Sequence, residues 1–100
     1  MKYPALHSLL AGLFYQCWAE YESESPDALI DGALKGLSIA EAMASKNEIE
    51  SLLNDCADEI PLADILVYEI GCNYDPVDDG KTVRTWLLEL LKKLNLHLNN

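Results

Sequence analysis

The sequence predicts an all-α fold, a single compact bundle of about five helices in which most neighbours run antiparallel. Two observations favour this fold: apolar residues recur every three or four positions along most of the chain, and helix start signals precede these stretches. The 100 residues contain no repeat and no linker long enough to divide them. We therefore expect one domain covering residues 1–100.

The first two expected helices lie in the N-terminal third of the chain. Residues 6–21 carry a continuous apolar stripe at helical spacing: Leu6, Leu9, Leu10, Leu13, Phe14, Cys17, Trp18 and Tyr21. Ser25 followed by Pro26 is a typical helix start, with a serine cap and a proline at the first helical position. We expect the second helix over residues 26–36.

The third and fourth helices are expected on either side of Pro61. Ser38 and Glu41 have capping-box spacing, and apolar residues continue at helical spacing as far as Cys56. Pro61 indicates a restart, because it has no N–H to donate to the preceding turn. Residues 62–70 have the β-branched content of a strand, but their apolar spacing suits a helix and no second strand is available to pair with them. We expect a short fourth helix that ends at Gly71.

A fifth helix is expected after Thr82, which can cap it. Its apolar stripe contains Trp86, just as the stripe of the first helix contains Trp18. Tryptophan on such a stripe is usually a core residue. Both side chains are therefore predicted to have structural roles.

The stretch "GCNYDPVDDG", residues 71–80, could be a metal site, an acid pair or a turn. Asp75, Asp79 and Gly80 match three positions of a calcium loop, but Val77 and Trp86 occupy two positions that require oxygen ligands. Aspartate and glycine are also common turn formers. We interpret the stretch as a structured turn, with structural roles for five of its residues: Gly71, Tyr74, Asp75, Pro76 and Gly80.

The sequence shows no catalytic motif, no metal ligand set and no cofactor fingerprint. His7 and His97 lie at opposite ends of the chain, and we expect both to be solvated. The cysteines Cys17, Cys56 and Cys72 have no pairing pattern and are interpreted as small buried hydrophobic residues. No enzymatic activity is expected.

The charge distribution is strongly asymmetric. The net charge is −10, and the segment from Glu20 to Asp79 contains sixteen acids but only Lys35 and Lys46 as bases. Such a surface repels nucleic acid and anionic lipid and attracts cationic partners, although acidity can also serve solubility alone. No apolar run reaches the roughly 18 to 20 residues that cross a bilayer, and no secretion signal is evident. We expect a cytoplasmic protein that binds neither membrane nor nucleic acid directly.

Four stretches are notable in combination: "YPALHSLLAGLFYQCWAEY", "SPDALID", "EIGCNYDP" and "DGKTVRTWLLELL". Together they resemble the immunity proteins of bacterial contact-dependent growth inhibition (CDI) systems over nearly the whole length. The chain departs from that pattern at Cys17 and Ala19, where members of the family often carry acids beside the tryptophan.

The resemblance implies a cytoplasmic inhibitor that binds the toxin domain of a cognate effector in a one-to-one complex. Toxins of this kind that act inside the cell are commonly nucleases, and a nuclease groove is basic because it holds phosphates. An acidic inhibitor can both approach such a groove rapidly and block it. The alternatives are an acidic DNA mimic and a small helical adaptor without catalytic activity.

The acids expected to contact the toxin come from two connections. If the helices alternate up and down, the ends of the first and third helices share a pole with the starts of the second and fourth. That pole would collect Glu20, Glu22, Glu24, Asp27, Asp55, Asp58, Glu59 and Asp64. The opposite pole would hold Asp75, Asp78 and Asp79 together with Lys2, Lys35 and Lys81, which partly cancel their charge.

Overall fold

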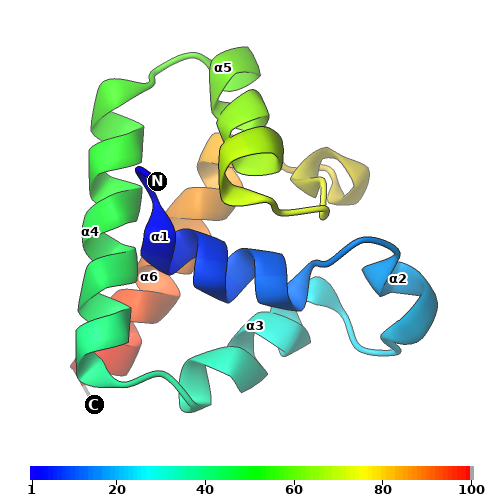
Figure 1. The fold of residues 1–100 in the computed structure, drawn as a ribbon, viewed down its shortest axis with the longest axis horizontal. Coiled ribbons are helices and arrows are strands. Elements are labelled where there is room, and N and C mark those ends of the chain that lie inside the picture. The colour runs from blue at the N-terminus through cyan, green and yellow to red at the C-terminus, as the bar shows by residue number, and fades with distance from the viewer. Residues whose placement is uncertain (100) are drawn as a thin grey trace.

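Two long helices, α4 (Ile39–Asp55) and α6 (Val83–Leu98), pack against each other and run in opposite directions, with α4 along the left edge in Figure 1. They belong to a computed structural model that describes residues 1–99. The residues that α6 buries form one stripe: Val83, Trp86, Leu87, Leu90 and Leu94. The buried residues of α4 are Ala42, Ser45, Ile49 and Leu52. The expected third and fifth helices are therefore confirmed.

The helix start signals in the sequence are present as hydrogen-bonded caps. The hydroxyl of Ser25 accepts a bond from the Ala28 N–H at 3.1 Å, at the start of α3 (Pro26–Lys35). Ser38 and Glu41 form both bonds of a capping box at the start of α4. The hydroxyl of Thr82 caps α6. These local signals place the starts of three helices correctly.

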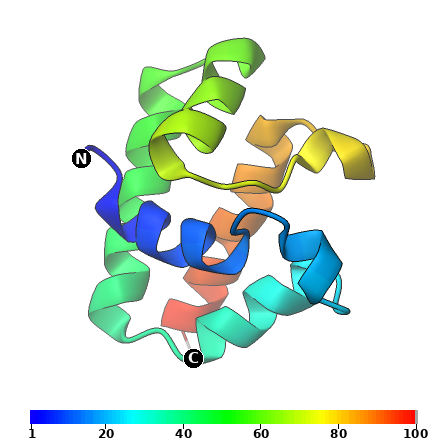
Figure 2. The same cartoon turned by 45° about the vertical axis from the view of Figure 1, so that its right-hand side comes forward.

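The first helical segment and α3 lie across α4 and α6 (Figures 1 and 2). The first segment consists of α1 (Pro4–Leu6) and a wider π-helical continuation, η1 (His7–Ala11). It runs antiparallel to α3 (Figure 1). The amino end of α1 is capped from α4, because the Ala5 and Leu6 N–H groups donate to the Glu48 carboxylate at 3.0 and 2.9 Å. This long-range cap fixes the crosswise orientation of α1 on α4.

The expected continuous helix over residues 6–21 is wrong, because the chain breaks after Phe14. In an unbroken helix the Phe14 carbonyl would accept the Trp18 N–H. Here it accepts two bonds from Asn73 instead, from the backbone N–H and from Nδ2, both at 3.0 Å. The chain then passes through Cys17, which has a left-handed backbone (φ 64°), and forms the four-residue helix α2 (Trp18–Tyr21).

The segment around Pro61 is a helix, as expected, and not a strand. It begins earlier than expected, with α5 (Glu59–Asp64), and continues as the π-helical η2 (Ile65–Ile70). Pro61 fits inside the first turn of α5, where its missing N–H would have no intrahelical partner. A 3₁₀ turn, η3 (Pro76–Asp79), follows. Every regular element within residues 1–99 is helical, so the all-α prediction is confirmed.

None of the helices in the described part of the chain is long and apolar enough to span a bilayer.

Candidate functional site

The segment at residues 71–80 is closed by backbone geometry at both ends. Gly71 and Gly80 adopt φ values of 84° and 75°, a left-handed region that disfavours residues with a Cβ. Between them, the Asp75 carboxylate accepts a bond from the Val77 N–H at 3.0 Å, and Pro76 is buried. A Cβ on Gly71 would also touch the side chain of Ala11 at 3.4 Å. The segment reverses the chain toward the start of α6.

Aromatic side chains attach this segment to the core. The rings of Phe14 and Tyr74 lie 5.2 Å apart, and those of Tyr74 and Trp86 lie 5.4 Å apart. Trp86 is buried, whereas Trp18 is half-buried and packs edge-on against Phe14 at 5.0 Å. The indole Nε1–H of Trp18 also points at the Asn73 carbonyl, at 3.4 Å. The aromatic cluster thus connects Phe14, at the end of the first helical segment, with α2, the 71–80 segment and α6.

The eight acids that were expected at one pole do not come together. Figures 1 and 2 place α2 on one side of the molecule and the connection between α4 and α5 at its top. The expectation of a shared pole is wrong because α1 crosses α4 instead of running beside it. Two separate groups result: an α2 acidic surface, made of Glu20, Glu22 and Glu24, and an α5 acidic surface, made of Asp55, Asp58, Glu59 and Asp64.

Asp27 belongs to neither surface, because it lies on a small polar cleft of about 250 Å³ between the start of α3 and η3. Tyr74, Asp79 and Lys81 line the same cleft. The Tyr74 hydroxyl donates to the Asp79 carboxylate at 2.5 Å. Burial, followed by this bond and the nearby acids, raises the pKa of Tyr74 well above its usual range. The structure therefore joins Asp27 to residues that were expected at the opposite pole.

The α2 acidic surface is mostly exposed, and α2 packs on the core through Trp18. None of the residues of α2 is fully buried. Tyr21 is 75% exposed, and the Tyr15 hydroxyl donates to the Glu22 carboxylate at 3.2 Å.

The α5 acidic surface includes one residue with a clear structural contact. The Glu59 carboxylate accepts bonds from the Val83 and Arg84 N–H groups, at 2.6 and 3.2 Å, and so caps the amino end of α6. Asp58 stands at the start of α5 without a side-chain cap bond. The Ser51 hydroxyl donates to Asp55 at 3.4 Å. Sequence patterns could not show the role of Glu59, because its partners lie 24 and 25 positions away.

Within residues 1–99, the negative charge of neither acidic surface is neutralised by an ion pair. Within the described residues the three ion pairs are Lys46–Glu50, Lys81–Glu89 and Lys93–Asp31. None of them includes an acid of either surface. Both surfaces can therefore attract a cationic partner without first breaking an internal pair.

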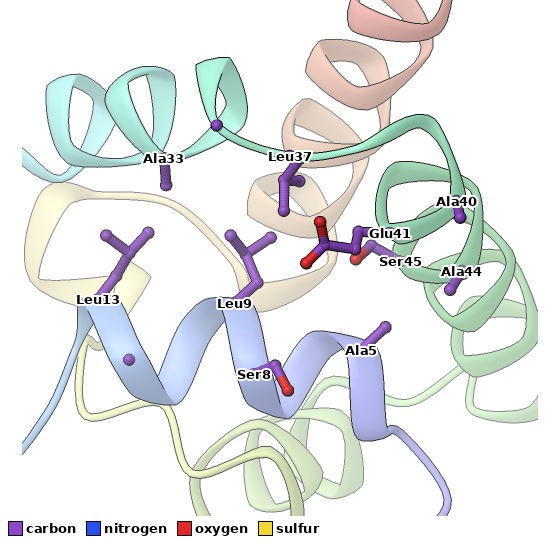
Figure 3. A pocket seen from close by; sticks show the side chains of 12 residues that line it. Ala5, Ser8, Leu9, Leu13, Ala33, Leu37, Ala40, Glu41, Ala44 and Ser45 are labelled. Carbon is purple, nitrogen blue, oxygen red and sulfur yellow. The ribbon is translucent and has the colours of Figure 1, made fainter.

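An apolar groove of about 570 Å³ opens between α1, α3 and the start of α4 (Figure 3). Figure 3 shows Leu9 and Leu13 pointing across it toward Ala33 and Leu37. Small residues on all three helices leave this space unfilled, among them Gly12. Glu41 also lines the groove, and its bond from the Ser38 N–H lowers the pKa of this carboxyl.

The histidines and two of the cysteines differ from expectation. His7 Nδ1 donates to the Ile70 carbonyl at 2.9 Å, and His97 Nε2 donates to the Leu37 carbonyl at 3.2 Å, so neither ring is simply solvated. Cys17 is exposed and Cys56 is only partly buried, so only Cys72 is a buried hydrophobic residue as expected. Burial raises the pKa of Cys72 to about 12.

Comparison with known proteins identifies the family. The family model described as "CdiI immunity protein" matches residues 2–94. The chain belongs to the CdiI immunity protein family. The family expected from the four sequence stretches is therefore confirmed.

A solved structure supports the same assignment. A chain of the crystal structure of the CdiA-CT/CdiI complex from Y. kristensenii 33638 is 26% identical to this one, with a TM-score of 0.83. The match covers 94% of this chain and 99% of that one. Among curated proteins, none is similar enough to count as a match.

Proposed function

We propose that this CdiI-family chain neutralises the toxin domain of its cognate CDI effector in the cytoplasm. It would act by binding, without catalysis of its own, in a one-to-one complex. Family membership over residues 2–94 carries this proposal. The similar chain from Y. kristensenii, which is part of a complex with CdiA-CT, supports a toxin domain as the partner.

The charge distribution favours a basic partner, in particular a nuclease. A nuclease holds its substrate phosphates in a positively charged groove, and the exposed acids of this chain can occupy such a groove. The eight acids that we expect to face the toxin are Glu20, Glu22, Glu24, Asp27, Asp55, Asp58, Glu59 and Asp64. After folding, they form the two acidic surfaces and one edge of the polar cleft, so a single toxin groove would cover only some of them.

The proposal is tested with the purified toxin domain of the cognate effector. We expect a co-eluting one-to-one complex, loss of nucleic-acid cleavage at equimolar inhibitor, and association that slows as salt rises. Failure to form a complex would contradict the toxin-neutralising role. A complex whose association rate does not change with salt would contradict only the electrostatic part. Tight binding to a DNA-binding protein instead would favour a DNA mimic.

A further inference from the structure

The outer face of α5 and η2 presents apolar side chains that the core does not use. The buried residues of this segment, Leu62, Leu66 and Ile70, recur every four positions. Ile60 and Tyr68 each lie two positions from a buried residue, on the opposite side of the helix, and are 77% and 82% exposed. A π-helical turn has more residues per turn than an α-helix, so residues four apart stay nearly in line along η2.

The segment formed by α5 and η2 therefore has two opposite faces. The inward face packs on α6 and on η1. The outward face carries Ile60, Asp64 and Tyr68 in a row, and Val67 beside them is 43% exposed. Ile60 and Tyr68, eight positions apart, thus offer two large side chains that a partner can cover.

Acids surround this apolar row. Asp58 precedes α5, Asp64 ends it, and Glu69 is next to Tyr68 on η2; all three are exposed. The sequence contains no lysine or arginine between Lys46 and Lys81. Lys2 lies over the Tyr3 ring at 5.9 Å, and Arg84 adjoins the start of α5, where its backbone N–H donates to Glu59. The face therefore combines apolar anchors with a negative rim, which complements a cationic surface.

This face is also better supported than the α2 acidic surface. Leu62, Leu66 and Ile70 hold α5 and η2 on the core with no more than 1% exposure, whereas α2 buries none of its residues fully. A surface that is already ordered loses less conformational entropy when it binds. Binding at the α5 acidic surface therefore loses less of its contact energy to ordering than binding at the α2 acidic surface.

We propose that the outer face of α5–η2 is the docking site for a cationic surface of the toxin domain. Ile60 and Tyr68 act as the apolar anchors, and Asp58, Asp64 and Glu69 meet lysine or arginine side chains around them. This inference rests on the proposed function. It selects one of two separate acidic surfaces and identifies the residues that supply binding energy there.

The test compares two exposed tyrosines, one on each acidic surface. Binding of the purified cognate toxin domain is measured by isothermal titration calorimetry for Tyr68→Ala, Ile60→Ala and Tyr21→Ala. An anchor side chain at the centre of an interface weakens binding by about 30-fold or more when it is truncated. We expect that loss for Tyr68→Ala and Ile60→Ala, and less than about a threefold change for Tyr21→Ala. All three side chains are mostly exposed, so the melting temperatures should match that of the wild type.

A charge variant provides a second readout. Asp64→Asn removes one negative charge at the centre of the face and should lower the association rate constant and its salt dependence. Glu24→Gln is the matched comparison on the α2 acidic surface and should lower both by less than Asp64→Asn does.

The outcomes separate this inference from the proposed function. If Tyr21→Ala and Glu24→Gln impair binding more than Tyr68→Ala, Ile60→Ala and Asp64→Asn do, the α5–η2 face is not the docking site, although the toxin-neutralising role stands. If none of the five changes affects a tight complex, docking at this face is equally overturned. If the wild-type protein does not bind the toxin, the proposed function fails and this inference fails with it.

Discussion

Replacing Glu59 with alanine should destabilise the fold, because its carboxylate closes the amino end of α6. The Val83 and Arg84 N–H groups donate to its two oxygens at 2.6 and 3.2 Å. These are the first two amides of the helix, and neither has an intrahelical acceptor. The change removes both bonds, and the alanine side chain supplies no acceptor in their place.

The expected magnitude follows from the burial and charge of this cap. A hydrogen bond to a charged group contributes about 1.5–3 kcal/mol, and an acid at a helix amino terminus adds about 0.3–1 kcal/mol. Because Glu59 is only half-buried, water can replace part of the lost bonding. We therefore expect the free energy of unfolding to fall by about 2 kcal/mol, which lowers the melting temperature by about 8–16 °C in a domain of this size.

Thermal unfolding followed by circular dichroism measures this effect. Glu59→Gln keeps an acceptor oxygen but loses the charge, so we expect about half the effect of the alanine change. Asp58→Ala is the neighbouring control, because Asp58 makes no side-chain cap bond, and it should cost less than about 1 kcal/mol. If Glu59→Ala costs under about 0.5 kcal/mol, or no more than Asp58→Ala, the capping argument is refuted.

Three further changes test other parts of the fold. Gly71→Ala and Gly80→Ala should each lower the free energy of unfolding by about 1–2 kcal/mol, because both glycines have a left-handed backbone. A Cβ at Gly71 meets Ala11 at an ordinary contact distance of 3.4 Å and one at Gly80 meets open space, so urea unfolding should give similar losses, and no loss at either position would contradict the backbone argument. Gly32→Ala, inside α3 with nothing near its Cβ, should raise the free energy of unfolding by about 0.5–1 kcal/mol, and a loss would show strain that the geometry does not reveal. Because burial raises the pKa of Cys72 to about 12 from 9.0, its thiol should resist iodoacetamide at pH 8 while exposed Cys17 is alkylated, as mass spectrometry can check. Because the pKa of Cys72 is higher in the folded chain, the unfolded chain loses its thiol proton first. The contribution of Cys72 to the free energy of unfolding is therefore complete below pH 9 and declines as the pH rises toward 12. Urea unfolding between pH 8 and 11 would show no such decline if Cys72 were accessible.

The Glu59 result would also affect how binding data are interpreted. Glu59 was expected to contact the toxin, and its carboxylate also caps α6. A Glu59 variant that binds toxin poorly and melts early reports on the fold as well as on the interface. Asp64 and Tyr68 are free of this difficulty, because both are exposed on the outer face of α5–η2.

The sequence by itself determined the helices whose signals lie within a few residues of each other. Ser25, Ser38 and Thr82 act on amides three positions away, so their caps could be predicted without knowing the rest of the fold. Gly71 ends its helix for a similarly local reason, because only its own backbone must turn left-handed. The all-α class and the family resemblance also follow from such short-range patterns.

Only the tertiary structure decided the features that depend on distant partners. Asn73 breaks the first helix by taking the Phe14 carbonyl across 59 positions, and Glu48 caps α1 across more than 40. The apolar stripe through Trp18 favoured an unbroken helix, and no local signal opposed it. The same long-range contacts turn α1 across α4 and divide the expected acidic pole into two surfaces. Spacing along the chain determines which residues can share a helix face, but the direction of each face is set only when the helices pack.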